Sequence, residues 1–416
     1  MPTTPPTALT PYLTPAHHRL WHEADAFAAE YIAPRVERME AAPHKAERKS
    51  AQLIAERGWF GVTIPKQYGG MAAGHVAKTV LIHRTGVVSA AAAAMLQASL
   101  IPIGAVQHWG TVEQKRQWLP QAAAGTLLLS IAVTEPRAGG HIGGIETVAE
   151  QDGDWWMITG EKVHIGNSHL AGLHVVVART APPNVSASQA LTAFLVEHDR
   201  KGLNRETHRP ALGLHGFTAG RLRLDRVRIP ATNVLGDIGQ GLSVAQSSSI
   251  LYGRLNLAGV SLGIHEAFVE VTTGFLKNRP RYDGTLADLD VLKDRLGDME
   301  ARLRAARILT YHAAHLLDQG ARCDGDLITA KYFGHTMAMD TGRTAMELHG
   351  SRAFDTTYVL ERLWRDIQMT YPPAGTGEFQ RIHLSKSTLG KAEIEWSERL
   401  AAETAWHQPI PDPTAA

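Results

Sequence analysis

The sequence has few of the features that mark secreted, membrane or nucleic-acid-binding proteins. Its single cysteine, Cys323, excludes an internal disulfide and suggests a reducing compartment, so a cytoplasmic location is expected. The N-terminal segment has neither a basic start nor an apolar run, and no stretch of about 18 apolar residues is evident, so no signal peptide or membrane span is expected. With 42 basic and 41 acidic residues, the net charge is +1, which offers no broad attraction for nucleic acid or an anionic membrane.

Two further absences concern cofactors. No G-x-G-x-x-G sequence follows a predicted strand, which argues against a nicotinamide-binding domain. Three histidines, His17, His18 and His22, lie on one predicted helix. Histidines on an amphipathic helix are most often surface residues, so no metal site is predicted.

The length and the patterning of the chain indicate a multidomain α+β protein. A chain of 416 residues is too long for one ordinary core, and its 44% hydrophobic and 20% charged residues are typical of a soluble protein. The pattern predicts a helical domain over residues 1–125, a β domain over 126–237 and a helical bundle over 238–416. The first dozen residues, rich in Pro and Thr, are expected to form a loose arm.

Within these domains the periodicity predicts individual elements. Residues 76–107 are apolar and alanine-rich and are expected to form a buried helical segment. Residues 243–279 are expected to form one long helix that ends before Pro280. The strands of the middle domain are expected to be short and antiparallel, without the rhythm of βαβ units. Apolar residues at three- and four-residue spacing predict a second long helix in the bundle: Leu289, Leu292, Leu296, Met299 and Leu303.

The most informative stretch is IAVTEPRAGGHIGGIETVAEQDGDWWMITGEKVHIGN, residues 131–167. It begins with β-prone residues, breaks at Pro136 and continues through a glycine-rich turn. Two short strands follow, joined by the turn Asp152-Gly153-Asp154. Composition alone indicates a β-rich segment whose glycines let the main chain approach something flat or bulky.

This stretch resembles the middle-domain signature of the acyl-CoA dehydrogenase family, A-x-T-E-P-x-A-G-S-D followed by G-D-x-W-x-x-N-G-x-K-x-W-I-T-N. Two later segments, AMELHGSRAFDTTYVLERLWRD and TYPPAGTGEFQR, resemble the family's C-terminal motifs. The resemblance covers almost the whole chain, and it implies a helical domain, a β domain and a four-helix bundle. It also implies bound FAD and a homodimer or homotetramer. The positions that match the signature are Thr134, Glu135, Pro136, Ala138, Gly139, Gly153, Asp154, Gly160, Lys162, Ile165 and Asn167.

The resemblance assigns residues to the FAD. Thr376 and Glu378 would face it, Gly350 would lie by its diphosphate, and Arg279 would reach it from the neighbouring subunit. The residues implied from the middle domain are Val133, Thr134, Gly139, Gly140, His164, Ile165 and Gly166.

The catalytic base is where the sequence departs from the family. Members oxidise an acyl thioester between Cα and Cβ, and a carboxylate removes the α-proton. Most carry that carboxylate at the position of Ala374, and a minority carry it at the position of Gly253. Neither residue can accept a proton, although the N–H of Ala374 could still polarise the thioester carbonyl.

Other replacements lie beside the same position. Gly166 stands for a Thr that hydrogen-bonds the flavin, and its small size is expected to open space there. His164 stands for a Trp that packs on the flavin, and a histidine titrates near neutral pH. His141 and His215 stand for an Asp and, often, an Arg. The group indicates either a degraded site or a site refitted for another reaction.

Three functions are therefore considered. The first is an FAD-dependent oxidoreductase acting on a thioester of coenzyme A or an acyl-carrier protein, whose base would be His164, another histidine, or none. The second is a flavin-dependent monooxygenase on the same fold, acting on a small molecule without need of a carboxylate. The third is a non-catalytic homologue or partner subunit.

Overall fold

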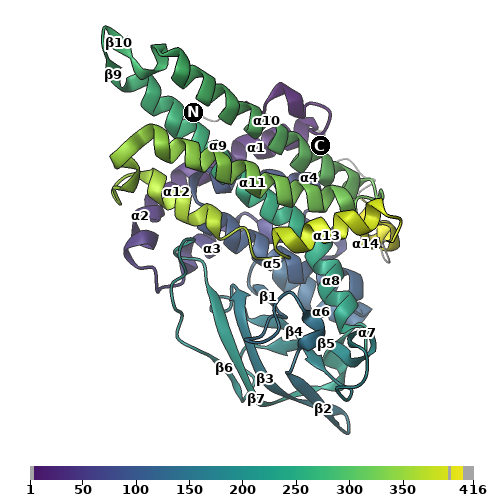
Figure 1. Cartoon of the computed structure of the whole chain (residues 1–416). Coiled ribbons are helices and arrows are strands. Elements are labelled where there is room, and N and C mark those ends of the chain that lie inside the picture. Colours follow the sequence, from purple (N-terminus) through teal and green to yellow (C-terminus); the bar gives the residue numbers. More distant parts are fainter. Residues whose placement is uncertain (1–3, 392–394, 406–416) are drawn as a thin grey trace.

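The computed structural model describes residues 4–391 and 395–405, which form a helical layer, a β-sheet and a helical bundle (Figure 1). The N-terminal layer contains α1 (Pro15–Phe27), η2 (Ala28–Ile32), α2 (Ala33–Ala41), α3 (Arg48–Glu56), α4 (Gly74–Val88), α5 (Ala90–Trp109) and α6 (Val112–Ala123). The predicted order of the three domains is confirmed.

The segment 76–107 is helical and buried, as expected, and it consists of two helices, because Ser89 adopts an extended conformation and its side chain caps α5 at the N–H of Ala92. Two expectations for this layer were wrong. The N-terminal arm is packed where it is described, since Leu9 is fully buried. His17 is also buried, because it forms a capping box with Thr14, and burial lowers its pKa to about 4.

The helix α5 is long and apolar enough to span a membrane, which corrects the expectation that no such stretch exists. It is the only helix of this kind among the described residues, and 89% of its most apolar 18 residues are buried inside the protein. It is therefore the central core helix of the N-terminal layer.

The middle domain is an eight-stranded sheet with the order β6-β7-β3-β2-β4-β5-β8, and β1 pairs with β4 off this path. The pairing of β1 with β4 is parallel, and β3 and β7 have twelve residues each, so the expectation of short antiparallel strands was only partly right. The strands are β1 (Leu129–Ala132), β2 (Val148–Asp152), β3 (Trp155–Gly166), β4 (Leu173–Arg179), β5 (Leu191–Glu197), β6 (Leu203–Arg205), β7 (Ala219–Pro230) and β8 (Val234–Leu235).

The C-terminal bundle begins with a helix that is not continuous. The predicted single helix is interrupted by the π-helical segment η7 (Ser249–Arg254), which lies between α8 (Gly241–Ser248) and α9 (Leu255–Asn278). Such π-segments often mark functional sites in helices. The other elements are the hairpin β9 (Pro280–Arg281) and β10 (Gly284–Thr285), α10 (Asp290–Asp318), α11 (Asp324–His349), η9 (Gly350–Phe354), α12 (Val359–Gln368), α13 (Gly377–Thr388), α14 (Trp396–Arg399) and α15 (Ala401–Thr404).

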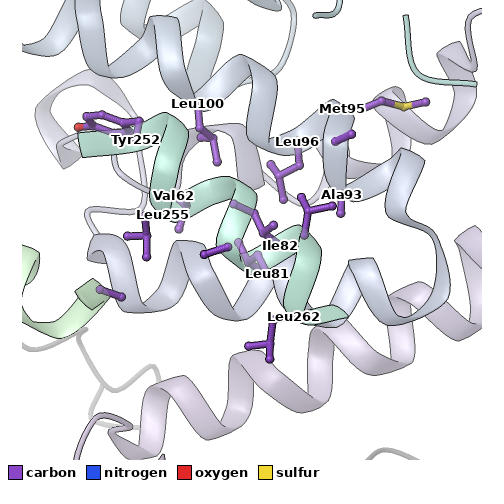
Figure 2. Close-up of a cluster of buried hydrophobic side chains, with 14 of the residues drawn as sticks. Val62, Leu81, Ile82, Ala93, Met95, Leu96, Leu100, Tyr252, Leu255 and Leu262 are labelled. Carbon is purple, nitrogen blue, oxygen red and sulfur yellow. The ribbon is translucent and has the colours of Figure 1, made fainter. Parts of the chain in front are cut away.

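The two helical layers share one core. Figure 2 shows side chains of α4, α5 and α9 meeting in it, with Ile82 and Leu96 near its centre. Glycine allows the helices to approach closely: a Cβ atom on Gly263 of α9 would lie 2.6 Å from the carbonyl carbon of Gly86 in α4. This contact holds α9 directly against α4.

Side-chain bonds tie the sheet to both helical layers. Asn167, at the end of β3, donates to the carbonyl of Met95 in α5 at 2.7 Å. Asp366 of α12 accepts the N–H of Leu214 at 2.6 Å, and burial raises the pKa of Asp366 to about 6. His215, one of the replaced positions, lies 2.9 Å from Glu40 of α2. The three domains therefore meet around the two motifs that carry the resemblance.

Candidate active site

A buried ion pair holds the Thr134-Glu135-Pro136 motif of the middle domain in place. Glu135 and Lys162 lie 2.7 Å apart, and their side chains are 4% and 0% exposed. The Glu135 carboxylate also accepts the N–H groups of Glu146 and Thr147, and Lys162 also donates to the carbonyl of Val133. Every strong polar group of this pair therefore has a partner within the protein.

The pKa values of the pair follow from this environment. Burial lowers the pKa of Lys162 to about 8. Burial alone would raise the pKa of Glu135, but the charge of Lys162 and the hydrogen bonds hold it below its usual value. The pair is consequently ionised at neutral pH, and it anchors the main chain of Val133 and Thr134 beside β3.

A β-bulge places His164 next to the main chain that the Glu135–Lys162 pair anchors. The register of β3 on β7 shifts between Lys162 and Ile165, so Val163 and His164 have no paired residues on β7. His164 is exposed and has a φ of 57°, which is uncommon for a residue with a Cβ. The bulge interrupts the pairing of β3 with β7 at His164, while the next residue, Ile165, is buried.

The glycine-rich turn beside the bulge is open. A Cβ atom on Gly139 or on Gly140 would have no other heavy atom within 4 Å. Thr134 is half-buried between this turn and β3, and its carbonyl accepts the N–H of Val163 at 2.9 Å. A planar ring with polar edges could lie against such a surface, because main-chain groups and a hydroxyl are available and few side chains obstruct it.

The space expected at Gly166 is not there. A Cβ atom on Gly166 would lie 3.0 Å from the ring of Phe217 and 3.2 Å from the Cβ of Ala98. The expectation that the lost threonine opens room beside the flavin was therefore wrong, because Phe217 from the loop before β7 takes up that volume.

The two positions where the family carries its base meet in the structure. A Cβ atom on Gly253 of η7 would lie 3.2 Å from the Cβ of Ala374, although the two residues are 121 positions apart. Ala374 has a φ of 55°, so its loop is held in an uncommon conformation. The N–H of Ala374 makes no hydrogen bond to any described residue, so it is free to donate to a thioester carbonyl.

Two buried cations that sequence reasoning missed lie next to these positions. Arg254 directly follows Gly253, and Lys331 of α11 donates to the carbonyls of Tyr371 and Gly375 at 3.0 and 2.5 Å, on either side of Ala374. Each residue is 2% exposed. A signal for Lys331 was present, because it falls on the apolar face of its helix with Leu327, Gly334 and Ala338.

No described contact joins His164 to Ala374 or Gly253. The titratable groups around the loop are instead Lys331, His335, whose ring lies 5.4 Å from that of Tyr371, and Glu378. Glu378 is exposed in the first turn of α13 and accepts the hydroxyl of Tyr371 at 2.5 Å. Thr376 is the residue before that helix, and it is half-buried.

Arg279 and Gly350 lie together, at another place in the molecule. Phe275, one turn before Arg279, stacks on His349, which precedes Gly350. Both predicted FAD residues are exposed, and Gly350 has a φ of 58° with no heavy atom within 4 Å of its Cβ position. Figure 1 shows the β9–β10 hairpin at the end of the bundle that lies far from the β domain.

These features fit the predicted FAD. The open turn at Gly139 and Gly140 and the exposed bulge at His164 suit a flat ring with hydrogen-bonding edges. The separation of Arg279 and Gly350 from that surface suits a site completed by a second subunit. His141, also exposed, contacts the turn from the side of Gly143 and Gly144.

Comparison with known proteins gives one consistent result. Residues 14–126, 130–227 and 239–389 match the N-terminal, middle and C-terminal domains of acyl-CoA dehydrogenases. The chain is 32% identical to an acyl-CoA dehydrogenase of Bacillus subtilis over 368 residues, which cover 88% of this chain and 95% of the relative.

Two further relatives are similar over nearly their full length. A 3-(aryl)acrylate reductase of Clostridium sporogenes is 28% identical over 379 residues, which cover 91% of this chain and 100% of that protein. The structure of butyryl-CoA dehydrogenase from Megasphaera elsdenii superposes with a TM-score of 0.87 at 26% identity, covering 91% of this chain and 99% of the other.

Proposed function

The chain belongs to the acyl-CoA dehydrogenase family, and we propose that it acts on its acyl thioester without a carboxylate base at either of the two family positions. It is an FAD-dependent oxidoreductase of acyl thioesters. The observation that carries the proposal is the direct approach of Gly253 and Ala374, neither of which has a group that can accept a proton.

The chain supplies binding and polarisation at this place. FAD, when bound, exchanges a hydride equivalent with the acyl group. The N–H of Ala374 donates to the thioester carbonyl, which stabilises negative charge that develops on that oxygen. Lys331 and Gln380 both donate to the carbonyl of Gly375, so the loop that carries this N–H is held from two sides.

A proton acceptor, where the reaction needs one, has to come from another group. His164 is exposed on the bulge, and His335 is half-buried beside Tyr371. Burial, with a smaller contribution from Lys331, lowers the pKa of His335 to about 4, so this imidazole is neutral at physiological pH. Both histidines are retained as candidates, together with a substrate whose α-proton is already acidic.

Anaerobic assay of the FAD-loaded protein tests this proposal. Butyryl-CoA and a butyryl thioester of an acyl-carrier protein are offered with an artificial electron acceptor, in the wild type and in His164→Ala and His335→Ala variants. We expect slow turnover of these simple thioesters in the wild type. Fast turnover that neither substitution reduces would contradict the assignment.

A monooxygenase acting on a small molecule is the second candidate, and the missing carboxylates favour it. Its other support, space at Gly166, is lost because Phe217 fills that volume. Oxygen uptake by the protein with a flavin reductase distinguishes the two activities. Substrate-dependent oxygen uptake together with an oxygenated product would establish the monooxygenase.

We also propose a homodimer or homotetramer in the cytoplasm. Arg279 directly precedes the β9–β10 hairpin, which Figure 1 shows at the end of the bundle far from the β domain, and the contact of Phe275 with His349 brings Gly350 near it; this separation supports an FAD site completed by a second subunit. Exposed apolar residues on α11 and α13, Phe333 and Ile382 among them, suit a subunit interface. An FAD-loaded monomer in sedimentation would contradict this assembly.

A further inference from the structure

Phe217 is an aromatic residue in the loop before β7, and its ring packs on the end of β3. The ring comes within 3.0 Å of the Cβ position of Gly166, and the Cβ of Ala98 in α5 lies 3.2 Å from the same point. Successive residues of a strand face opposite sides, and Ile165 points into the core of the β domain, so Gly166 faces the helical layer. Phe217 therefore takes up the space where β3 meets α5.

The loop that carries Phe217 is bonded on both sides of this residue. The carbonyl of Gly216 accepts the N–H of Glu47 at 2.9 Å. The carbonyl of Thr218 accepts the N–H of Asn167, the residue that directly follows β3, at 2.8 Å. The side chain of Phe217 is half-buried and packs against the main hydrophobic core. The ring consequently has a defined place at the end of β3.

This place borders the surface assigned to the FAD. Residues 130–227 match the middle domain of the family, and through that match Gly166 stands for a threonine that hydrogen-bonds the flavin. The three nearest atoms around the Cβ position of Gly166 are carbons of Phe217 and Ala98. Since Phe217 is only half-buried, part of its side chain is not covered by the protein. An apolar wall thus replaces a hydroxyl group beside the bound ring.

An apolar wall at this place affects the reaction of the cofactor with dioxygen. That reaction moves two electrons and a proton from reduced FAD to O2 and takes one more proton from solvent, which gives oxidised FAD and hydrogen peroxide. Negative charge develops on the oxygen beside the flavin, so the reaction needs space and a polar environment there. Phe217 offers no hydrogen-bond donor, and it fills the space at Gly166.

We propose that Phe217 excludes dioxygen from the edge of the FAD at Gly166, so that reduced FAD persists until another electron acceptor oxidises it. This inference rests on the proposed function, because it takes an FAD-dependent oxidation as the activity of the chain. It gives Phe217 control over the choice of electron acceptor, and it separates that control from the positions Gly253 and Ala374.

Reoxidation of the reduced protein tests this control without any acyl substrate. The FAD-loaded protein is reduced by light in the absence of oxygen and mixed rapidly with oxygenated buffer, and the return of flavin absorbance is followed. We expect Phe217→Ala to reoxidise at least about tenfold faster than the wild type, which corresponds to about 1.4 kcal/mol of activation free energy. Phe217→Leu opens a smaller gap and should reoxidise at a rate between those of the other two proteins.

Acrylamide quenching of the flavin fluorescence measures access to the cofactor without a redox step. The quenching constant should be larger in Phe217→Ala than in the wild type. Trp155→Ala is the matched control, because Trp155 is also a half-buried aromatic residue of this domain, and it is the first residue of β3 whereas Gly166 is the last. The control should keep the reoxidation rate and the quenching constant of the wild type.

The outcomes separate this inference from the function on which it rests. Reduced wild type that reoxidises as fast as Phe217→Ala would overturn the inference, while reduction of its FAD by an acyl thioester would still support the proposed function. An equal increase in Trp155→Ala would also overturn it, because the effect would then come from general loosening of the domain. Wild-type protein that binds no FAD would contradict the proposed function itself. If Phe217→Ala does not fold, equal rates in Phe217→Leu and the wild type would overturn the inference.

Discussion

Two buried lysines in this protein have opposite surroundings. Lys162 belongs to the frame of the site, which is the ion pair with Glu135 and the main chain it anchors. Lys331 belongs to the reactive end, which is the contact of Gly253 with Ala374 and the residues that hold it. Lys162 meets Glu135 at 2.7 Å, and that carboxylate is further held by two main-chain N–H groups. Among the described residues, Lys331 meets only carbonyl oxygens, and it has the charge of Arg254 as a neighbour. The frame is therefore internally paired, whereas no described carboxylate pairs with the lysine of the reactive end.

This contrast explains why the sequence matches the family motifs but lacks the carboxylate at the positions of Gly253 and Ala374. The residues that hold the main chain around the cofactor surface form a closed set of bonds, so they persist without a ligand. The reactive end consists of short side chains over buried cations, so its charge balance depends on what binds there. A degraded site would be expected to lose its frame as well, so the intact frame favours the proposal of a site refitted at one end.

The largest effect is expected from restoring a carboxylate at the reactive end. Ala374→Glu should place it beside Gly253 and near both cations, whose charges favour its ionised form. General-base catalysis contributes about a hundred- to ten-thousand-fold, so α,β-dehydrogenation of butyryl-CoA should rise within that range. The assay uses an artificial electron acceptor and runs up to about pH 9, in case burial raises the pKa of the new carboxyl. Unchanged activity with FAD and thioester still bound would show that the two positions do not flank the α-carbon.

Breaking the frame is expected to cost stability next. Lys162→Met leaves the Glu135 carboxylate buried without its counter-charge, which should lower the free energy of unfolding by about 3–5 kcal/mol and reduce the FAD content. Urea-induced unfolding followed by flavin fluorescence measures the change. The double variant Glu135→Leu with Lys162→Met is the control and should recover much of the loss. A loss below about 1 kcal/mol in the single variant would contradict the role given to the pair.

The pH dependence of stability should distinguish the two ends. The pKa of Lys331 is about 7 in the folded protein and 10.5 when unfolded, so between these values the unfolded state binds more protons. Stability contributed at this residue therefore rises with pH across that window, by at most about 1.4 kcal/mol per pH unit. Unfolding of the wild type and of Lys331→Met at pH 7.5 and 9.5 gives the difference. Equal slopes in the two proteins would show that the pKa of Lys331 is not lowered in the folded state.

The smallest expected effect concerns the packing beside the frame. Gly166→Thr adds atoms within 3.0 Å of Phe217, so it should destabilise the protein by about 1–3 kcal/mol. Adding Phe217→Leu should recover part of this loss, because the new side chain then has space. Gly139→Ala is the matched control and should be nearly neutral, since no heavy atom lies within 4 Å of its Cβ position. Additive effects of the Gly166 and Phe217 substitutions would argue against their contact.

Much of the fold could be predicted because the signals are local. The helical periodicity and the strand-like segments gave the order of the three domains, and the motif at Thr134, Glu135 and Pro136 gave the family. The partner of a strand is not encoded in its own pattern, so the parallel pairing of β1 with β4 was missed. The break at Ser89 was also missed, because an N-cap inside an alanine-rich run changes the pattern of apolar residues very little.

The site was predictable in its parts but not in its contacts. The empty positions Gly253 and Ala374 were both found from the motifs, but their contact, in which a Cβ on Gly253 would lie 3.2 Å from that of Ala374, depends on packing between η7 and a distant loop. Phe217 was not considered, since nothing in its local sequence points to Gly166. Lys331 carried a readable signal as a charge on an apolar helix face, but a single sequence does not say which carbonyls it would meet.

The measurement that tests the central claim most directly is the rate at which butyryl-pantetheine reduces the bound flavin of the wild type in the absence of oxygen. The rate is followed by the loss of flavin absorbance after rapid mixing, at thioester concentrations that saturate binding. If the reactive end has no carboxylate base, reduction should be slower by a factor of about a hundred or more than in Ala374→Glu. Reduction of the wild type as fast as that of the variant would show that another group serves as the base, and would contradict the account.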